Sequence, residues 1–217
     1  MPFLKDFIIN NSTKIILWKI IPGELDQNHL NENDKGLFKK RKGKNSKEYF
    51  LAVRKILKNE NPELLIKYDL NGKPHLNIQK GISISHSNEI VAVGISNEKD
   101  FGIDIQYKTN KILKIKHKFL SEMDNVSMTN KYDLESLTML WTAKESIYKA
   151  LGVKGISFSK NIIIDKDLEE KKSCKGYYIN ENEKTIFNLI FFYVDGYTIC
   201  CANKVRSDKS DKKIIKN

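Results

Sequence analysis

The hydrophobic pattern of the chain predicts several short strands and a few longer helices. Apolar residues recur at helical spacing over residues 46–58, and helices are also predicted over 111–120 and about 132–151. Strand-like apolar runs lie at 14–21, 64–70, 81–85, 89–96, 101–106, 157–164, 175–180, 186–194 and 197–203. Each half of the chain is therefore expected to contain a helix followed by several strands.

The longest predicted helix ends in the stretch Trp141 to Gly152, which carries a charged pair. The stretch is rich in good helix formers, lacks proline, and reaches a glycine suited to a helix C-terminus. Glu145 and Lys149 lie four positions apart, so their side chains share one face. In isolation such a pair is usually a surface salt bridge that contributes a few tenths of a kcal/mol. A functional interpretation needs a second feature.

That second feature is Asp104, in the predicted strand 101–106. It lies between Ile103 and Ile105, a pattern typical of a buried strand, where an unpaired carboxylate is costly. Two carboxylates from separate elements, with a lysine one helical turn away, suit a divalent metal ion bound beside a phosphate.

At these residues the chain resembles the 4'-phosphopantetheinyl transferases of the surfactin-synthetase-activating type. Gly102-Ile103-Asp104-Ile105-Gln106 and the helix motif Trp-Thr-Ala-Lys-Glu-Ser-Ile-Tyr-Lys match two motifs of that family. The turn Gly72-Lys73-Pro74 and the stretch 83–87, Ser-Ile-Ser-His-Ser, match two more. The four motifs occur in the family's order over residues 72–152. Each motif is weak alone, but the ordered set is specific.

The resemblance implies an α+β fold of two similar halves related by a pseudo-twofold axis. Each half would be a long helix packed on a small, mostly antiparallel sheet, with the active site between the halves. We expect an N-terminal half over 1–100, a C-terminal half with the metal-site acids over 101–205, and a disordered basic tail over 206–217. A chain of two halves resembles the monomeric class of the family.

The resemblance also implies the reaction. Coenzyme A would be the substrate, the acceptor would be a serine hydroxyl of an acidic apo carrier protein, and 3',5'-ADP would leave. Negative charge spreads over phosphate oxygens in such a transfer, so positioning and cationic stabilisation matter most. Mg²⁺, or alternatively Mn²⁺, is the expected metal ion.

Three residues are implied as metal ligands. Asp104 and Glu145 are the acids, and Gln106 stands where many members of the family have a third acid. Its amide oxygen is neutral, so direct coordination and contact through a water both stay open. Lys149 corresponds to the lysine that reaches the pyrophosphate. Lys144 points about 100° away around the helix, and it either contacts phosphate or is exposed.

Coenzyme A contacts are implied in the first half of the chain. His86 is expected to contact a phosphate, with Ser85 adding a hydroxyl or a backbone donor. Lys73 is expected to contact the nucleotide. The basic stretch 39–44 corresponds to the site of the adenosine 3'-phosphate, with a solvated charge run as the alternative. Within it we favour Lys39, Arg41 and Lys44.

A general base is needed near the incoming serine. The family carries an acid shortly after a phenylalanine-rich helix end, and the best match in this chain is Asp124. Glu122 is the neighbouring alternative, and the other explanation for these acids is the ordinary polarity of a helix or loop.

The composition of the chain bears on its cellular location. No apolar run reaches the roughly 18–20 residues that span a bilayer, and the N-terminal residues lack the pattern of a signal peptide. The three cysteines form neither a disulfide framework nor a metal-ligand spacing. We therefore expect a cytoplasmic protein without a membrane partner.

The net charge of +11 allows acidic partners of several kinds. A basic nucleic-acid-binding module is one alternative, but it explains neither Asp104 nor the Lys-Glu helix motif. A metal-dependent phosphohydrolase using the same acids is another. For the transferase, the predicted helix 111–120 would dock the carrier, because it carries Lys111, Lys114, Lys116 and Lys118 among apolar residues.

Overall fold

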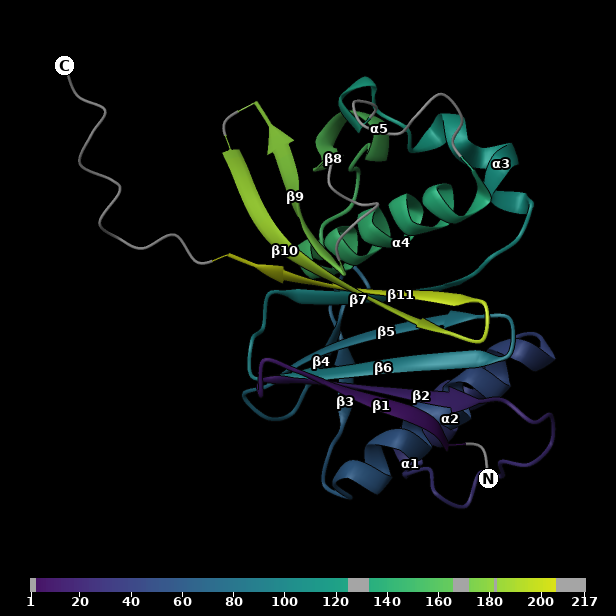
Figure 1. Cartoon of the computed structure of the whole chain (residues 1–217). Helices are drawn as coiled ribbons and strands as arrows, with labels where there is room; N and C mark the ends of the chain where they lie inside the picture. Colours follow the sequence, from purple (N-terminus) through teal and green to yellow (C-terminus); the bar gives the residue numbers. More distant parts are fainter. Residues whose placement is uncertain (1–2, 125–132, 166–171, 182, 206–217) are drawn as a thin grey trace.

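Two sheets with helices packed on them make up the fold (Figure 1). The computed structural model describes residues 3–124, 133–165, 172–181 and 183–205. The first elements are β1 (Phe3–Ile9), β2 (Thr13–Lys19), α1 (Glu32–Lys40), α2 (Lys44–Glu60), β3 (Ile66–Tyr68), β4 (Pro74–Leu76), β5 (Gly81–Ser87) and β6 (Ile90–Ser96). The later elements are β7 (Phe101–Tyr107), α3 (Lys111–Ile115), η1 (Lys116–Lys118), η2 (Glu122–Asp124), α4 (Leu134–Leu151), α5 (Phe158–Asn161), β8 (Ile162–Ile164), β9 (Ser173–Asn180), β10 (Glu183–Val194) and β11 (Tyr197–Lys204). The predicted α+β class is confirmed.

The first sheet has the strand order β1-β2-β6-β5, and every neighbouring pair is antiparallel. Helix α2 lays its apolar stripe on one face of this sheet, as the helical spacing over 46–58 predicts. The core between them contains Ala52, Val53, Ile56 and Leu57 from the helix with Ile82, Val91 and Val93 from the strands. Strands β3 and β4 form a separate small hairpin.

The second sheet has the order β7-β11-β10-β9-β8 and carries α4 on one face. The side chain of Asp133 caps the start of α4 by accepting the Ser136 N–H, and Gly152 ends the helix with a φ of 65°. The buried face of α4 packs on strands β8, β10 and β11 through Leu137, Leu140, Ala143, Ile147 and Ala150.

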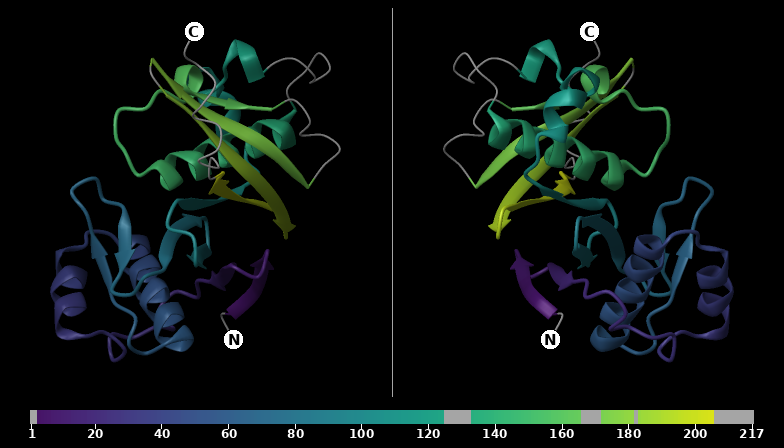
Figure 2. Two further views of the ribbon diagram at one scale, coloured as in Figure 1. Left: turned by 90° about the vertical axis from the view of Figure 1, so that its left-hand side faces the viewer. Right: turned by 90° about the vertical axis from the view of Figure 1, so that its right-hand side faces the viewer.

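The remaining faces of the two sheets pack against each other. Ile15 and Leu17 of β2 meet Ile103 of β7 and Ile199 of β11 in this layer. Strands with both faces buried read as continuous apolar runs, which is why residues 15–18 do not alternate with polar ones. Helices α1 and α2 lie at the opposite end of the molecule from the helices of the second sheet (Figure 2).

Gly102 explains how β7 comes so close to α4. A Cβ atom at this position would overlap the backbone oxygen of Ser146 and the backbone nitrogen of Ala150. Only glycine allows this approach. The glycine of the Gly-Ile-Asp motif therefore brings the next residue on the same strand face, Asp104, against the helix that carries Glu145.

Some elements differ from their predictions. The strand predicted over 157–164 begins as the helical turn α5, because the Asn161 side chain accepts the Ser157 N–H, and only its last three residues form β8. The helix predicted over 111–120 is the short α3 followed by a 3-10 turn. The polar stretch 24–47 contains α1, which Asn31 caps. Strands β1 and β4 were not predicted.

The predicted division between residues 100 and 101 stays a prediction, as does the pseudo-twofold relation of the halves. All strands of the first sheet precede this position, and β7 is the first strand of the second sheet. The predicted tail 206–217 lies outside the described residues. Among the described residues, no helix is long and apolar enough to cross a membrane.

Candidate active site

The predicted acids and lysine come together where α4 packs against β7. Lys149 Nζ donates to Asp104 Oδ1 over 2.7 Å. Asp104 is only 5% exposed, and Glu145 precedes Lys149 by about one helical turn on α4. The structure thus joins Asp104, Glu145 and Lys149 in one cluster, although the strand and the helix are far apart in the sequence.

Glu145 is a carboxylic acid in a site that disfavours its charge. Burial raises the pKa of Glu145 to about 7, the negative charge of Asp104 acts in the same direction, and Lys149 opposes both. One lysine therefore does not compensate the two carboxylates, and the site would accept further positive charge.

Asp104 has one satisfied and one unsatisfied oxygen. Oδ1 accepts hydrogen bonds from Lys149 and Ser85, whereas Oδ2 is buried without a partner among the described residues. A divalent cation would satisfy Oδ2 and offset the repulsion from Glu145, so the residues present fit such an ion. No group of three or more His, Cys, Asp or Glu residues suited to a metal ion exists within the described ranges. The chain would thus supply two carboxylates, and substrate or water the remaining ligands.

The hydroxyl of Ser85 is already engaged. Its Oγ donates to Asp104 Oδ1 over 2.6 Å and accepts the Ile105 N–H over 3.2 Å. A serine hydroxyl has one proton, which here points to Asp104. The predicted hydroxyl contact of Ser85 with coenzyme A is at odds with this arrangement, and the backbone donor stays a prediction.

His86 lies on β5 and stacks on Tyr49 of α2, with ring centroids 4.0 Å apart and 15° between the rings. Desolvation lowers the pKa of His86, the charge of Lys149 lowers it further, and Asp104 opposes. Tyr49 in turn donates to the Asn88 carbonyl over 2.5 Å, which holds its ring in place. His86 therefore favours the neutral state, with one N–H donor and one acceptor. From sequence alone, Tyr49 is only one of the aromatic residues in the helical pattern over 46–58, and nothing there indicates its contact with His86.

Two adjoining pockets connect His86 with Lys149. One, of about 360 Å³, is lined by His86, Arg41 and Tyr49 among others. The second, of about 190 Å³, is lined by Lys73 and Lys149 among others. They share the lining residues Gly72, Pro74 and Ile84. We call the two together the interhalf cleft.

Arg41 is the member of the basic stretch that reaches the interhalf cleft. Its guanidinium lies 4.6 Å from the centre of the Phe50 ring, and Nη1 donates to Ser46 Oγ over 3.2 Å. Its Nε is buried without a partner among the described residues, so one donor is unused. Lys39 and Lys44 are exposed and do not line the pocket that holds Arg41 and His86.

Lys73 lines the cleft and also caps α4. Its Nζ donates to the Ala150 carbonyl over 2.7 Å, and Asn71 Nδ2 donates to the Gly152 carbonyl over 3.1 Å. Cations and hydrogen-bond donors at the C-terminus of a helix satisfy its free carbonyls and complement its dipole. Desolvation lowers the pKa of Lys73. The Gly-Lys-Pro turn thus joins the β3–β4 hairpin to α4, and its nucleotide contact stays a prediction.

Gln106 lies two residues beyond Asp104 on β7, so the two side chains share one face of the strand. Its Nε2 donates to the Tyr107 carbonyl over 3.2 Å. A role of Gln106 at a metal ion stays a prediction.

Asp124 is not placed to act as a base. Its side chain is fully buried and pairs with Lys144 over 2.5 Å. Its oxygens also accept the backbone N–H groups of Ser121 and Ile164, each over 2.9 Å. Both carboxylate oxygens are used and none faces solvent, so the predicted catalytic role of Asp124 is at odds with the structure. The alternative, Glu122, is exposed on η2.

Lys144 is neither exposed nor placed at a phosphate, the two possibilities considered from sequence. Its side chain is fully buried, and desolvation lowers its pKa while Asp124 opposes. Besides Asp124, its Nζ contacts the carbonyls of Phe119, Phe158 and Ile162. Lys144 thus ties the segment after η1, and α5, to α4 beside Glu145. Nothing in the local sequence distinguished it from a surface lysine.

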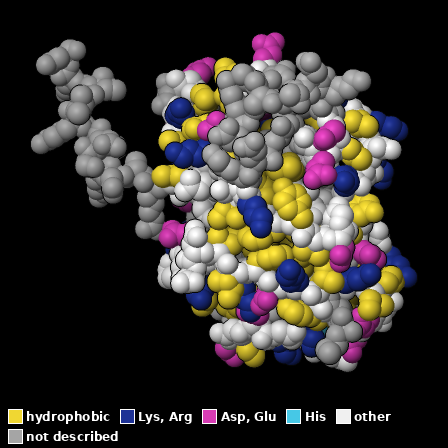
Figure 3. Space-filling model, viewed as in Figure 1, with side chains coloured by type: hydrophobic (Ala, Val, Ile, Leu, Met, Phe, Trp, Pro, Cys, Tyr) yellow, Lys and Arg dark blue, Asp and Glu magenta, His cyan; other side chains and the backbone are white. Residues whose placement is uncertain are grey.

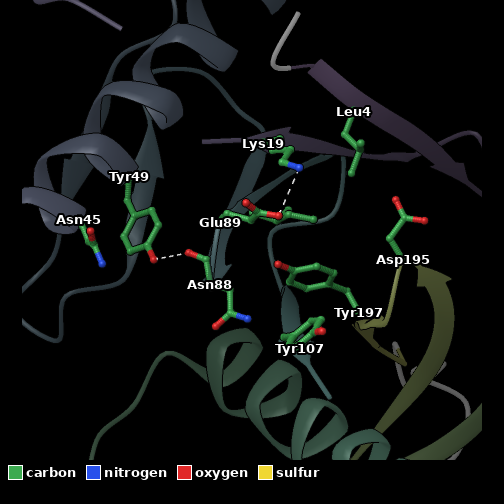
Figure 4. A pocket seen from close by; sticks show the side chains of 10 residues that line it. Leu4, Lys19, Asn45, Tyr49, Asn88, Glu89, Tyr107, Asp195 and Tyr197 are labelled. Carbon is green, nitrogen blue, oxygen red and sulfur yellow. Dashed lines mark hydrogen bonds and ion pairs between the residues drawn. The ribbon is translucent and has the colours of Figure 1, made fainter. Parts of the chain in front are cut away.

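A separate hollow of about 680 Å³ lies near the end of β7 (Figure 4). Tyr107 and Tyr197 form one wall, with ring centroids 4.9 Å apart, and Tyr49 forms another. An ion pair of Lys19 with Glu89, 3.3 Å long, lies at its edge. None of the predicted site residues lines this hollow.

Comparisons with known proteins match the part of the chain that carries Asp104, Glu145 and Lys149. A family model described as the 4'-phosphopantetheinyl transferase superfamily matches residues 100–202. The chain is 31% identical over 163 residues to 4'-phosphopantetheinyl transferase gsp of Aneurinibacillus migulanus, an alignment of 70% of this chain and 65% of that protein. It is 33% identical over 112 residues to the Synechocystis sp. protein named "Putative 4'-phosphopantetheinyl transferase slr0495", covering 47% of this chain and 45% of that protein. The chain spans less than two thirds of the length of either relative.

Proposed function

We propose that the chain transfers the 4'-phosphopantetheine group of coenzyme A to a serine hydroxyl of a carrier protein, because a family model of the 4'-phosphopantetheinyl transferase superfamily matches residues 100–202. The observation that supports this most is the buried, unpartnered Oδ2 of Asp104 beside Glu145 and Lys149. Oδ2 would take a cation, and Lys149, which contacts Asp104 and lines the interhalf cleft, would take a phosphate next to it.

In the proposed reaction the serine oxygen attacks the phosphorus nearer pantetheine. A new phosphorus–oxygen bond forms, the bond to the bridging oxygen of the pyrophosphate breaks, and 3',5'-ADP leaves. Lys149 supplies an ammonium group to the pyrophosphate oxygens, on which charge grows. His86 supplies an N–H donor, and Arg41 its unused Nε donor, to coenzyme A phosphates.

Asp104 and Glu145 would hold the metal ion, through Oδ2 of Asp104 and the carboxylate of Glu145. When bound, Mg²⁺ or Mn²⁺ supplies positive charge to the reacting phosphate. Gln106 is retained as a contact to the metal ion, either directly or through a water. Glu122 is retained as the candidate base for the serine proton, because Asp124 is committed to Lys144.

The transferase is tested directly by intact mass. The chain is incubated with coenzyme A, Mg²⁺ and an apo carrier protein, and the carrier is expected to gain one phosphopantetheine group. A carrier with its acceptor serine changed to alanine is the matched control and should gain nothing. Hydrolysis of coenzyme A with an unmodified carrier would replace the proposal with a phosphohydrolase, and no reaction at all would reject it.

We further propose that α3 and η1 dock the carrier. Lys111, Lys114, Lys116 and Lys118 are exposed along this segment, and Leu113 is 40% exposed among them. Ile112 and Phe119 are buried in the core and hold the segment on α4. This mixture of exposed lysines with Leu113 suits an acidic helix with an apolar stripe. The largest gathering of apolar side chains on this face of the molecule lies across its middle (Figure 3).

Charge reversal of Lys114 and Lys118 to glutamate is expected to raise the KM for the carrier and weaken its dependence on salt. The KM for coenzyme A should stay nearly unchanged, because electrostatic steering acts on the protein partner. His86→Ala should show the opposite pattern. Both KM values are measured at two ionic strengths. A larger effect of the reversals on coenzyme A would assign these lysines to the nucleotide instead.

We also propose a cytoplasmic monomer. The residues of the candidate site come from both parts of a single chain, so no second copy is needed to complete the arrangement described. Cys200 and Cys201 are buried free thiols, which fits a reducing compartment. The kind of carrier, acyl or peptidyl, is left to the mass assay.

A further inference from the structure

Strands β5 and β7 run side by side, although they belong to different sheets (Figure 1). β5 is the last strand of the first sheet, and β7 is the first strand of the second. Two exposed strand edges that meet in this way usually pair through their backbones. The strand orders show no backbone pairing between β5 and β7. Other contacts must therefore satisfy the backbone N–H groups along the edge of β7.

Three serines of β5 provide these contacts. The Oγ atoms of Ser83, Ser85 and Ser87 accept the backbone N–H groups of Ile103, Ile105 and Tyr107, over 2.9, 3.2 and 2.9 Å. Each pair is separated by 20 residues, so the two strands run in the same direction. We call this set the serine seam.

The seam follows from the geometry of both strands. Side chains two residues apart point to the same face of a strand, so three alternating serines form one row of hydroxyl groups. In an edge strand, every second N–H points away from its own sheet, and these are the N–H groups that the row accepts. The alternation in Ser-Ile-Ser-His-Ser is thus the sequence signal of the seam.

Ser85 differs from the other two serines of the seam. In the described structure, it is the member that also donates its proton to Asp104 Oδ1. The Ile105 N–H occupies a lone pair of Ser85 Oγ, which leaves the single hydroxyl proton for Asp104. Oδ1 is then saturated by Ser85 and Lys149, and Oδ2 is the oxygen left open.

We propose that the serine seam replaces backbone pairing between the two sheets, and that Ser85 is a positioning residue that holds the Asp104 carboxylate for a divalent cation. The second part rests on the proposed function, whereas the seam itself does not. Partners that orient a metal ligand typically change metal affinity or activity by about 10–100-fold when they are removed. Ser83 and Ser87 serve as internal controls, because they share the seam but not the carboxylate.

The seam is tested by amide hydrogen exchange on the full chain. Ser83→Ala should speed exchange at Ile103, Ser85→Ala at Ile105, and Ser87→Ala at Tyr107, each more than at the other two amides. Each variant should lower Tm by about 2–4 °C, the shift typical of losing one hydrogen bond in a chain of this size. Unchanged exchange at the three amides would overturn the seam.

The positioning role is tested with Mn²⁺ as the probe, by electron paramagnetic resonance of the free ion, with and without coenzyme A. Ser85→Ala should weaken Mn²⁺ binding by about tenfold or more. Ser83→Ala and Ser87→Ala should change Mn²⁺ affinity less than twofold despite a similar loss in Tm. Ser85→Thr keeps the hydroxyl, so it should bind Mn²⁺ about as tightly as the unmodified chain.

These outcomes separate the inference from the transferase proposal. The positioning role of Ser85 would be overturned if the three alanine variants changed Mn²⁺ affinity equally, or if the unmodified chain bound no Mn²⁺. If the chain binds Mn²⁺ in this selective way but modifies no carrier, the transferase proposal fails while the role of Ser85 stands.

Discussion

Glu145→Gln and Asp104→Asn are each expected to reduce turnover by at least about a hundredfold with coenzyme A and an apo carrier. Each change removes a negative charge that would hold the metal ion beside the reacting phosphate. A single electrostatic contact to developing charge is typically worth roughly 3–4 kcal/mol. The measurement is kcat at saturating Mg²⁺. A second series with excess metal ion shows whether the turnover of the variants is restored.

The controls for these variants come from the same site. Burial and Asp104 disfavour the charge of Glu145, so Glu145→Gln should leave Tm unchanged or raise it in the absence of metal ion. Gln106→Ala should cost less activity than either acid variant, because its amide is neutral and donates to its own strand. Near-normal turnover of both acid variants would remove the metal assignment.

Lys144→Met is expected to destabilise the chain by about 3–5 kcal/mol, the usual result of leaving one member of a buried ion pair without its partner. Asp124 would be left without its cation in a site with no exposure, and the carbonyls that Lys144 contacts would lose their donor. Typical total stabilities are about 5–15 kcal/mol, so the loss is a large share. Urea denaturation followed by circular dichroism measures it.

The double variant Lys144→Met with Asp124→Asn tests the cause. Replacing both charges removes the uncompensated carboxylate, so it should recover part of the loss, while asparagine can still accept the Ile164 N–H. Lys160→Met, on an exposed lysine of α5, is the surface control and should stay within about 0.5 kcal/mol of the parent. A loss below about 1 kcal/mol for Lys144→Met would contradict the buried ion pair.

The α+β class and most strands followed from the hydrophobic pattern, because strands buried on both faces leave long apolar runs. The helix that became α4 was predicted almost to its ends, since propensity, capping and the terminal glycine agree over Leu134 to Gly152. Strand β1 and helix α1 were missed. β1 is largely exposed, and Lys5 and Asp6 interrupt its apolar residues, whereas α1 depends on the single cap at Asn31.

Within the candidate site, the sequence by itself determined that Glu145 and Lys149 share a helix face and that Gly102 and Asp104 share a strand face. Covalent geometry sets those spacings wherever the element lies. Only the tertiary structure decided that Asp124 pairs with Lys144, that Ser85 holds Asp104, and that Lys73 caps α4. These contacts join elements that are distant in the chain, and the ionic and hydrogen-bonding state of a buried group depends on which partners packing brings to it.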